Sequence, residues 1–206
     1  MSNTAIATTD VESILERACE GHTLPDEVGD LADAARRDAY DGASAEETYE
    51  AVLGGLTARI ERDPVYKQVA ANVFRQRYFR EVVGADPTGY ERDKAYRETF
   101  VENIARMVDL ELLDDRMTER FDLEALADAL EPERDAKFEY MALDTLYQRY
   151  FLKTTEGERL ELPQAFWMRV AMGLALEEDD PEERAKEFYE VLSKLEFTPS
   201  SPTLFH

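Results

Sequence analysis

The fold is decided by one stretch of sequence, Pro163-Gln164-Ala165-Phe166-Trp167-Met168-Arg169-Val170-Ala171-Met172-Gly173-Leu174-Ala175-Leu176. Proline suits the first turn of a helix, so Pro163 predicts a helix that runs to about Leu176. The segment is apolar nearly all round, which is typical of a helix that is buried on all sides or meets a missing neighbour. Arg169 is its one charge, and a buried guanidinium needs a partner. We expect Arg169 to pair with a nearby glutamate; the alternative is that it faces a ligand.

Apolar residues recur at helical spacing through almost the whole chain, which predicts an all-α protein. Ser44 followed by Glu47 predicts a capping box at the start of one helix. Between the helices, residues 150–162 are expected to form a short hairpin or extended loop that turns at Glu156-Gly157. Helices are expected near residues 11–19, 27–38, 45–60, 64–83, 91–109, 123–130, 138–150, 164–176 and 181–195. The last of these is expected to bury Phe188, Val191, Leu192 and Leu195.

A polar segment without apolar residues, 131–135, is the expected internal boundary. It divides the chain into a helical region, 1–135, and a second region, 136–206. The second region closes with two Pro, two Thr and two Ser within residues 198–203, where the chain is predicted to leave a helix and head into a strand.

The net charge is −22, from 46 acidic against 24 basic residues. This charge repels the phosphates of nucleic acid, whose binding needs clustered Lys and Arg, and it disfavours anionic membrane surfaces. The acidic residues are spread over every expected helix and do not form a tail. We therefore expect a surface adapted to high salt, which screens self-repulsion; an acidic surface evolved for a basic partner is the alternative.

A cytoplasmic protein is expected from the single cysteine, Cys19, which excludes an intrachain disulfide and a thiolate metal cluster. No apolar run approaches the roughly 18 residues of a membrane span. Residues 1–10 lack the basic and apolar regions of a signal peptide, and we expect a frayed terminus there.

Residues suited to catalysis are few. With His22 in a loop and His206 as the only histidines, no His-based metal site or catalytic triad is expected. Cys19 is expected to be a buried core thiol, with a reactive thiol as the alternative. The acidic run 177–180 could hold a hard cation, but a solvated loop with a helix cap is the preferred interpretation. Gly54-Gly55 is expected to be a close packing point within a helix.

Three ordered blocks of sequence resemble the all-helical domain of ribonucleotide reductase large subunits, over roughly residues 136–206. They are Tyr-Gln-Arg-Tyr-Phe-Leu at 147–152, Glu-Leu-Pro-Gln-Ala-Phe-Trp-Met-Arg-Val-Ala at 161–171 and Ser-Ser-Pro-Thr-Leu-Phe at 200–205. The resemblance implies an all-helical fold that leads to the first strand of a catalytic barrel.

Residues 11–84 more loosely resemble the later half of the ATP-binding cone of some members of that family. Tyr40-Asp41-Gly42, Ile60 to Asp63 and Ala70-Ala71 carry this likeness. The basic strand that begins a cone is absent, since residues 1–10 contain no Lys or Arg. Ala45 stands where the cone has a nucleotide-contacting threonine. The resemblance thus implies a degenerate cone or a plain helical domain.

The resemblance also implies one binding role. In the family, the hydroxyl residue just before the Pro-Thr-Leu element hydrogen-bonds the substrate's phosphates, and in this sequence that residue is Ser201. A small hydroxyl beside free backbone N–H groups is a suitable partner for an oxyanion. Thr203 is a second substrate-binding candidate. The alternative is that Ser201 only caps or turns the chain.

By this resemblance the chain is expected to be an amino-terminal piece of a ribonucleoside-diphosphate reductase large subunit, from a split gene, an interrupted gene or a truncation. The family's catalytic residues lie downstream of such a sequence, so the chain is expected to be inactive by itself and to bind no cofactor. Its implied partners are the remaining barrel, a ribonucleotide substrate and a radical source, either adenosylcobalamin or a dimetal small subunit. The alternative function is a non-catalytic helical interaction or regulatory module.

Overall fold

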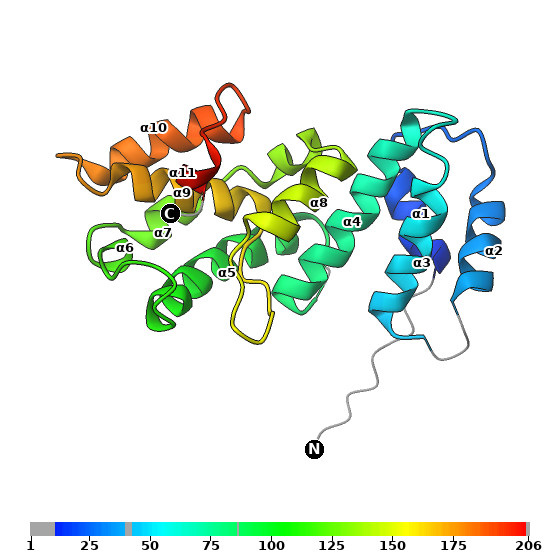
Figure 1. Cartoon of the computed structure of the whole chain (residues 1–206), viewed down its shortest axis with the longest axis horizontal. Coiled ribbons are helices and arrows are strands. Elements are labelled where there is room, and N and C mark those ends of the chain that lie inside the picture. Colours follow the sequence, from blue (N-terminus) through cyan, green and yellow to red (C-terminus); the bar gives the residue numbers. More distant parts are fainter. Residues whose placement is uncertain (1–10, 40–42, 86, 205–206) are drawn as a thin grey trace, which may run out of the picture. The chain divides into compact units, whose positions relative to one another are not determined.

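The computed structural model describes residues 11–39, 43–85 and 87–204, and these residues are mostly helical. The prediction of an all-α protein is confirmed (Figure 1). Within the described ranges, β pairing is limited to one isolated bridge between Lys153 and Arg159. The expectations for residues 1–10, for Tyr40-Asp41-Gly42 and for His206 concern parts of the chain outside those ranges.

The chain forms two compact units, one of residues 1–78 and 138–144 and the other of residues 79–137 and 145–206. In the first unit, two amide side chains of α4 bind the carbonyls of α1: Asn72 donates to Ala18 at 2.6 Å and Gln76 to Ile14 at 3.3 Å. The helices α1, α2 and α3 pack on one another around buried aliphatic side chains. The helices that lie wholly or partly in this unit are α1 (Val11–Cys19), α2 (Val28–Asp38), α3 (Ala45–Thr57), α4 (Val65–Val83) and α8 (Tyr140–Arg149).

Local sequence signals set the ends of these helices. At the start of α3, the Ser44 hydroxyl accepts from the Glu47 N–H at 3.2 Å, and the Glu47 carboxylate accepts from the Ser44 N–H at 2.8 Å. The predicted capping box is therefore present. Gly84 follows α4 with a φ of 79°, a left-handed conformation that favours glycine.

The second unit is organised around α9 (Pro163–Ala175), which packs against α10 (Pro181–Ser193). All residues from Pro163 to Met172 are buried, as the apolar sequence predicts. The other elements that lie wholly in this unit are α5 (Gly89–Asp109), α6 (Arg116–Glu119), α7 (Leu123–Asp128), a 3-10 helix (Pro132–Lys137) and α11 (Ser201–Leu204).

The segment between α8 and α9 is the predicted hairpin-like loop. The Leu160 N–H donates to the Leu152 carbonyl at 3.1 Å, and the Thr154 N–H donates to the Glu158 carbonyl at 2.9 Å. Gly157 takes a φ of 93° at the turn.

Three local expectations are wrong. Ser201–Leu204 is a short helix and not the start of a strand, because the Thr203 N–H bonds back to the Ser200 carbonyl at 3.0 Å. On α10 the buried side chains are Ala185, Tyr189, Leu192 and Ser193. Val191 is 39% exposed, because α9 covers a different face of α10, and Phe188 is half-buried. Leu195 is 40% exposed and lies beyond the end of the helix. Gly54 is not a close packing point, since a methyl group there would meet no atom within 4 Å.

None of the helices in the described ranges has the length and hydrophobicity that crossing a membrane requires.

We predict that Ser44→Ala lowers the free energy of unfolding by about 1 kcal/mol, because it removes the oxygen that satisfies the Glu47 N–H. Urea unfolding followed by circular dichroism measures the change. Ser13→Ala is the control, because Ser13 is exposed within α1, and it should shift stability by less than about 0.5 kcal/mol. Equal effects of the two substitutions would show that the cap does not stabilise α3.

Candidate functional site

Arg169 and Glu161 form a buried ion pair in the second unit. Their side chains are 0% and 1% exposed. The Arg169 Nε donates to Glu161 Oε1 at 2.6 Å and Nη2 donates to Oε2 at 3.3 Å, so the expected glutamate partner is confirmed. Glu161 Oε2 also accepts from the Leu152 N–H at 2.6 Å. The Glu161 carboxylate therefore connects both sides of the hairpin-like loop to α9.

The same guanidinium also lies close to two backbone carbonyl groups, one in α11 and one just after α8. Its Nη1 and Nη2 atoms lie 3.4 and 3.3 Å from the Leu204 carbonyl oxygen in α11. Nη2 also lies 3.5 Å from the carbonyl oxygen of Tyr150, just after α8. One buried cation thus joins α9, α11 and the residue that follows α8.

Ser201 and Thr203, the two expected substrate contacts, lie together in α11. Ser201 is exposed, and its Oγ is 2.9 Å from the hydroxyl oxygen of Tyr150. Thr203 is half-buried. The pairing of Tyr150 with Ser201 was not predicted, because 51 residues separate the two in sequence. The arrangement presents one fixed hydroxyl on an exposed turn, which is suited to hydrogen-bonding an oxyanion.

A buried polar network holds the amino end of α9, and sequence reasoning missed it. The Tyr96 hydroxyl accepts from the Gln164 N–H at 2.8 Å and donates to Asp135 Oδ2 at 3.1 Å. Gln164 donates to Asp135 at 2.8 Å and accepts from the Tyr189 hydroxyl at 3.1 Å. Burial raises the pKa of Tyr189 to about 12, so its hydroxyl stays protonated at neutral pH. The only signal in the sequence is the amide of Gln164 in an apolar helix.

Arginine side chains bind the other end of α9. Arg120 donates to the carbonyl of Leu176, and at 3.2 Å to the carbonyl of Glu178. Arg116 forms two bonds with the Asp114 carboxylate, at 2.9 and 2.8 Å, and one with Glu177 at 2.5 Å. Cations are favourable at the carboxyl end of a helix, where the carbonyl groups have no helical partner.

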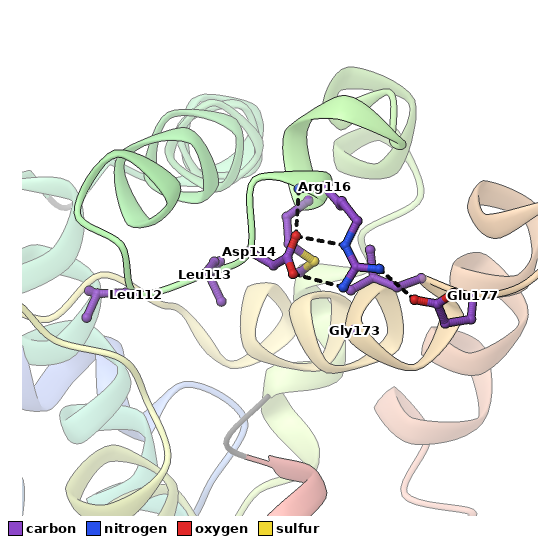
Figure 2. Close-up of a pocket in the computed structure, with 8 residues that line it drawn as sticks. Leu112, Leu113, Asp114, Arg116, Gly173 and Glu177 are labelled. Atoms are coloured by element: carbon purple, nitrogen blue, oxygen red, sulfur yellow. Dashed lines mark hydrogen bonds and ion pairs between the residues drawn. The ribbon is translucent and has the colours of Figure 1, made fainter.

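A pocket of about 340 Å³ lies beside this end of α9 (Figure 2). Hydrogen bonding to Arg116 holds the pKa of Asp114 down at about 2. Since Arg116 binds both Asp114 and Glu177, the pocket's charged groups already have partners within the protein. Its lining consists of Leu112, Leu113, Asp114, Arg116, Met117, Gly173, Leu176 and Glu177.

The remaining candidates from the sequence lie apart from α11 along the chain. Cys19 is half-buried, not fully buried as expected, and burial raises the pKa of its thiol, which lowers its reactivity at neutral pH. Asp180 precedes α10 without a side-chain capping bond. No group of three or more His, Cys, Asp or Glu side chains in the described ranges is placed to hold a metal ion.

We predict that Arg169→Met lowers the free energy of unfolding by about 3–5 kcal/mol, because Glu161 is then buried without a counter-charge. Urea unfolding followed by circular dichroism measures the loss. The matched control is Arg106→Met, which breaks an exposed ion pair with Glu158 and should leave stability close to that of the wild type. Similar losses in both variants would contradict a special role for the buried pair.

Comparisons with known proteins extend these observations. Residues 136–206 match the family described as "Ribonucleotide reductase, all-alpha domain". Over 93% of its length, the chain is 40% identical to the ribonucleoside-diphosphate reductase subunit alpha of Chlamydia trachomatis, of which it covers 18%. It is 37% identical, over 82% of its length, to the subunit of that name from Helicobacter pylori, of which the matched part is 21%.

The similarity includes the region that precedes the matched domain, because both alignments are longer than residues 136–206. The chain spans about 18% of the length of the chlamydial relative. The buried α9, its ion pair and the turn with Ser201 all lie within the matched segment. Residues 136–206 therefore belong to the all-alpha domain family of ribonucleotide reductases.

Proposed function

We propose that the chain is the amino-terminal part of a ribonucleoside-diphosphate reductase large subunit. Such an enzyme replaces the 2′-hydroxyl of a ribonucleotide with hydrogen and so supplies deoxyribonucleotides for DNA synthesis. The similarity to subunits of that name over 93% of the chain carries the proposal. The chain covers 18% of the chlamydial subunit, so the proposal assigns the chemistry to the remaining polypeptide. The proposal divides the chain as expected from the sequence. One region is residues 1–135, with a remnant ATP-cone-like part near 11–84, and the other is residues 136–206.

In this proposal Ser201 binds the substrate's phosphates, with Thr203 as a second contact. The supporting geometry is an exposed Ser201 hydroxyl on a turn whose Leu204 carbonyl is held by a buried guanidinium. A hydroxyl donates to an anionic oxygen without adding a charge that the fold would have to solvate. Fixing the turn beforehand reduces the entropy that ordering would otherwise cost on binding.

The proposed partners are the remaining barrel portion of the large subunit and a source of the radical. The described residues do not fit a dimetal centre, since they offer no cluster of metal-ligating side chains. The radical source in this proposal is either a dimetal small subunit or adenosylcobalamin. A cytoplasmic location, expected from the single cysteine, belongs to the same proposal.

The test is co-expression of the chain with the remaining part of the large subunit, followed by a reductase assay with the radical source. Formation of deoxyribonucleotide should require both polypeptides. Ser201→Ala should raise the KM for the ribonucleotide about tenfold, because it removes one hydrogen bond to a charged group. Ser200→Ala is the matched control, because Ser200 is the adjacent exposed serine, and it should leave KM unchanged.

Two outcomes would contradict the proposal. A stable complex without turnover would favour a helical interaction module. Turnover that is indifferent to Ser201→Ala would leave Ser201 as a turn residue.

We further propose that the acidic composition is an adaptation to high salt. The net charge is −22, so the acidic side chains repel one another in dilute buffer and destabilise the folded chain. The midpoint of urea unfolding should rise when sodium chloride increases from about 0.1 M to about 1 M, as the screening length falls to about 3 Å. Chloride is used instead of sulfate, which stabilises proteins by exclusion from their surface. An unchanged or lower midpoint would contradict salt adaptation.

A further inference from the structure

We propose that Tyr150 is a positioning residue for substrate binding. Its hydroxyl donates a hydrogen bond to Ser201 Oγ, which leaves the serine proton to donate to a phosphate oxygen. This inference rests on the proposed function, because it needs a phosphate contact at Ser201. It adds Tyr150 to the proposed phosphate site and states which of the two hydroxyl groups donates the hydrogen bond.

The direction follows from what each group can donate and accept. The two hydroxyl oxygens are 2.9 Å apart, a normal distance for an O–H···O bond, and either could be the donor. Each hydroxyl has one proton and two acceptor lone pairs, whereas a phosphate oxygen facing Ser201 can only accept. If Ser201 donated to Tyr150, it would have no proton left for the ligand. Tyr150 must therefore be the donor when phosphate is bound.

This arrangement also strengthens the contact with phosphate. A hydroxyl that accepts one hydrogen bond becomes a better donor of the next, since bonds in a chain polarise each other. Without a partner, the exposed Ser201 side chain would distribute its oxygen over several staggered rotamers. The bond to Tyr150 selects one of them before the substrate arrives.

The structure fixes both members of the pair through the same cation. The Tyr150 N–H donates to the Leu146 carbonyl at 2.9 Å, which continues the hydrogen bonding of α8. Arg169 lies within 3.5 Å of the Tyr150 carbonyl oxygen and within 3.4 Å of that of Leu204. Because both carbonyls belong to the segments that carry the two hydroxyls, the distance between Tyr150 and Ser201 depends on the buried guanidinium.

The experiment is a double-mutant cycle in the assembled reductase, with cytidine 5′-diphosphate as substrate. The variants are Tyr150→Phe, Ser201→Ala and the combination of the two. We expect Tyr150→Phe to raise KM about 3- to 10-fold, the value of one hydrogen bond, with kcat nearly unchanged. The double variant should be no worse than Ser201→Ala, because Tyr150 acts through the serine.

Tyr147→Phe is the control, since it removes a tyrosine hydroxyl three residues earlier, within α8. That hydroxyl binds Glu81 at 2.9 and 3.0 Å and not α11, so KM should stay at the wild-type value. The melting temperature of each variant is measured beside its kinetics. Tyr150→Phe should melt close to the wild type, because the ring that packs is retained.

The outcomes separate this inference from the proposed function. An unchanged KM in Ser201→Ala would remove the phosphate contact and the inference together. A raised KM in Ser201→Ala with no change in Tyr150→Phe would overturn the inference and leave the phosphate contact standing. Independent effects that multiply in the double variant would also overturn it, because Tyr150 would then act by another route.

Discussion

The second unit depends on the buried ion pair between Arg169 and Glu161. Removing two charges from water costs several kcal/mol for each ion, and their attraction offsets this cost only when the geometry is good and the remaining polar atoms are bonded. The pair meets both conditions, since Glu161 also accepts from the Leu152 N–H and the guanidinium reaches the carbonyls of Tyr150 and Leu204. The hairpin-like loop, the end of α8 and α11 therefore meet α9 at one place.

Polar contacts hold α9 along its whole length. Tyr96 binds the Gln164 N–H at the amino end, Glu161 binds Arg169 in the middle, and Arg120 binds carbonyl groups just beyond the carboxyl end. An apolar surface by itself tolerates small shifts of one helix along another, because hydrophobic burial is not directional. Hydrogen bonds have narrow distance and angle requirements, so they fix the register of α9 against its neighbours.

This rigidity bears on the phosphate contact that we propose for Ser201. An exposed serine hydroxyl beside a tyrosine is suited to orienting a phosphate group. Binding energy from a remote part of a substrate helps to place its reacting part. In the proposed function, the helical platform that holds Ser201 in position has such a supporting role, and the chemistry is assigned to the rest of the large subunit.

The sequence by itself determined the longer helices, the capping box at Ser44 and Glu47, the burial of α9 and the need of Arg169 for a glutamate. These features follow from local periodicity, from side-chain to backbone bonds over three residues, and from the cost of an unpaired buried charge. Only the tertiary structure decided the contacts between distant segments. It chose Glu161 as the partner, brought Tyr150 to Ser201 across 51 residues, and placed the Leu204 carbonyl beside Arg169. It also left Val191 exposed on α10, since the buried face of a helix depends on the neighbour that packs against it and not on its own apolar residues.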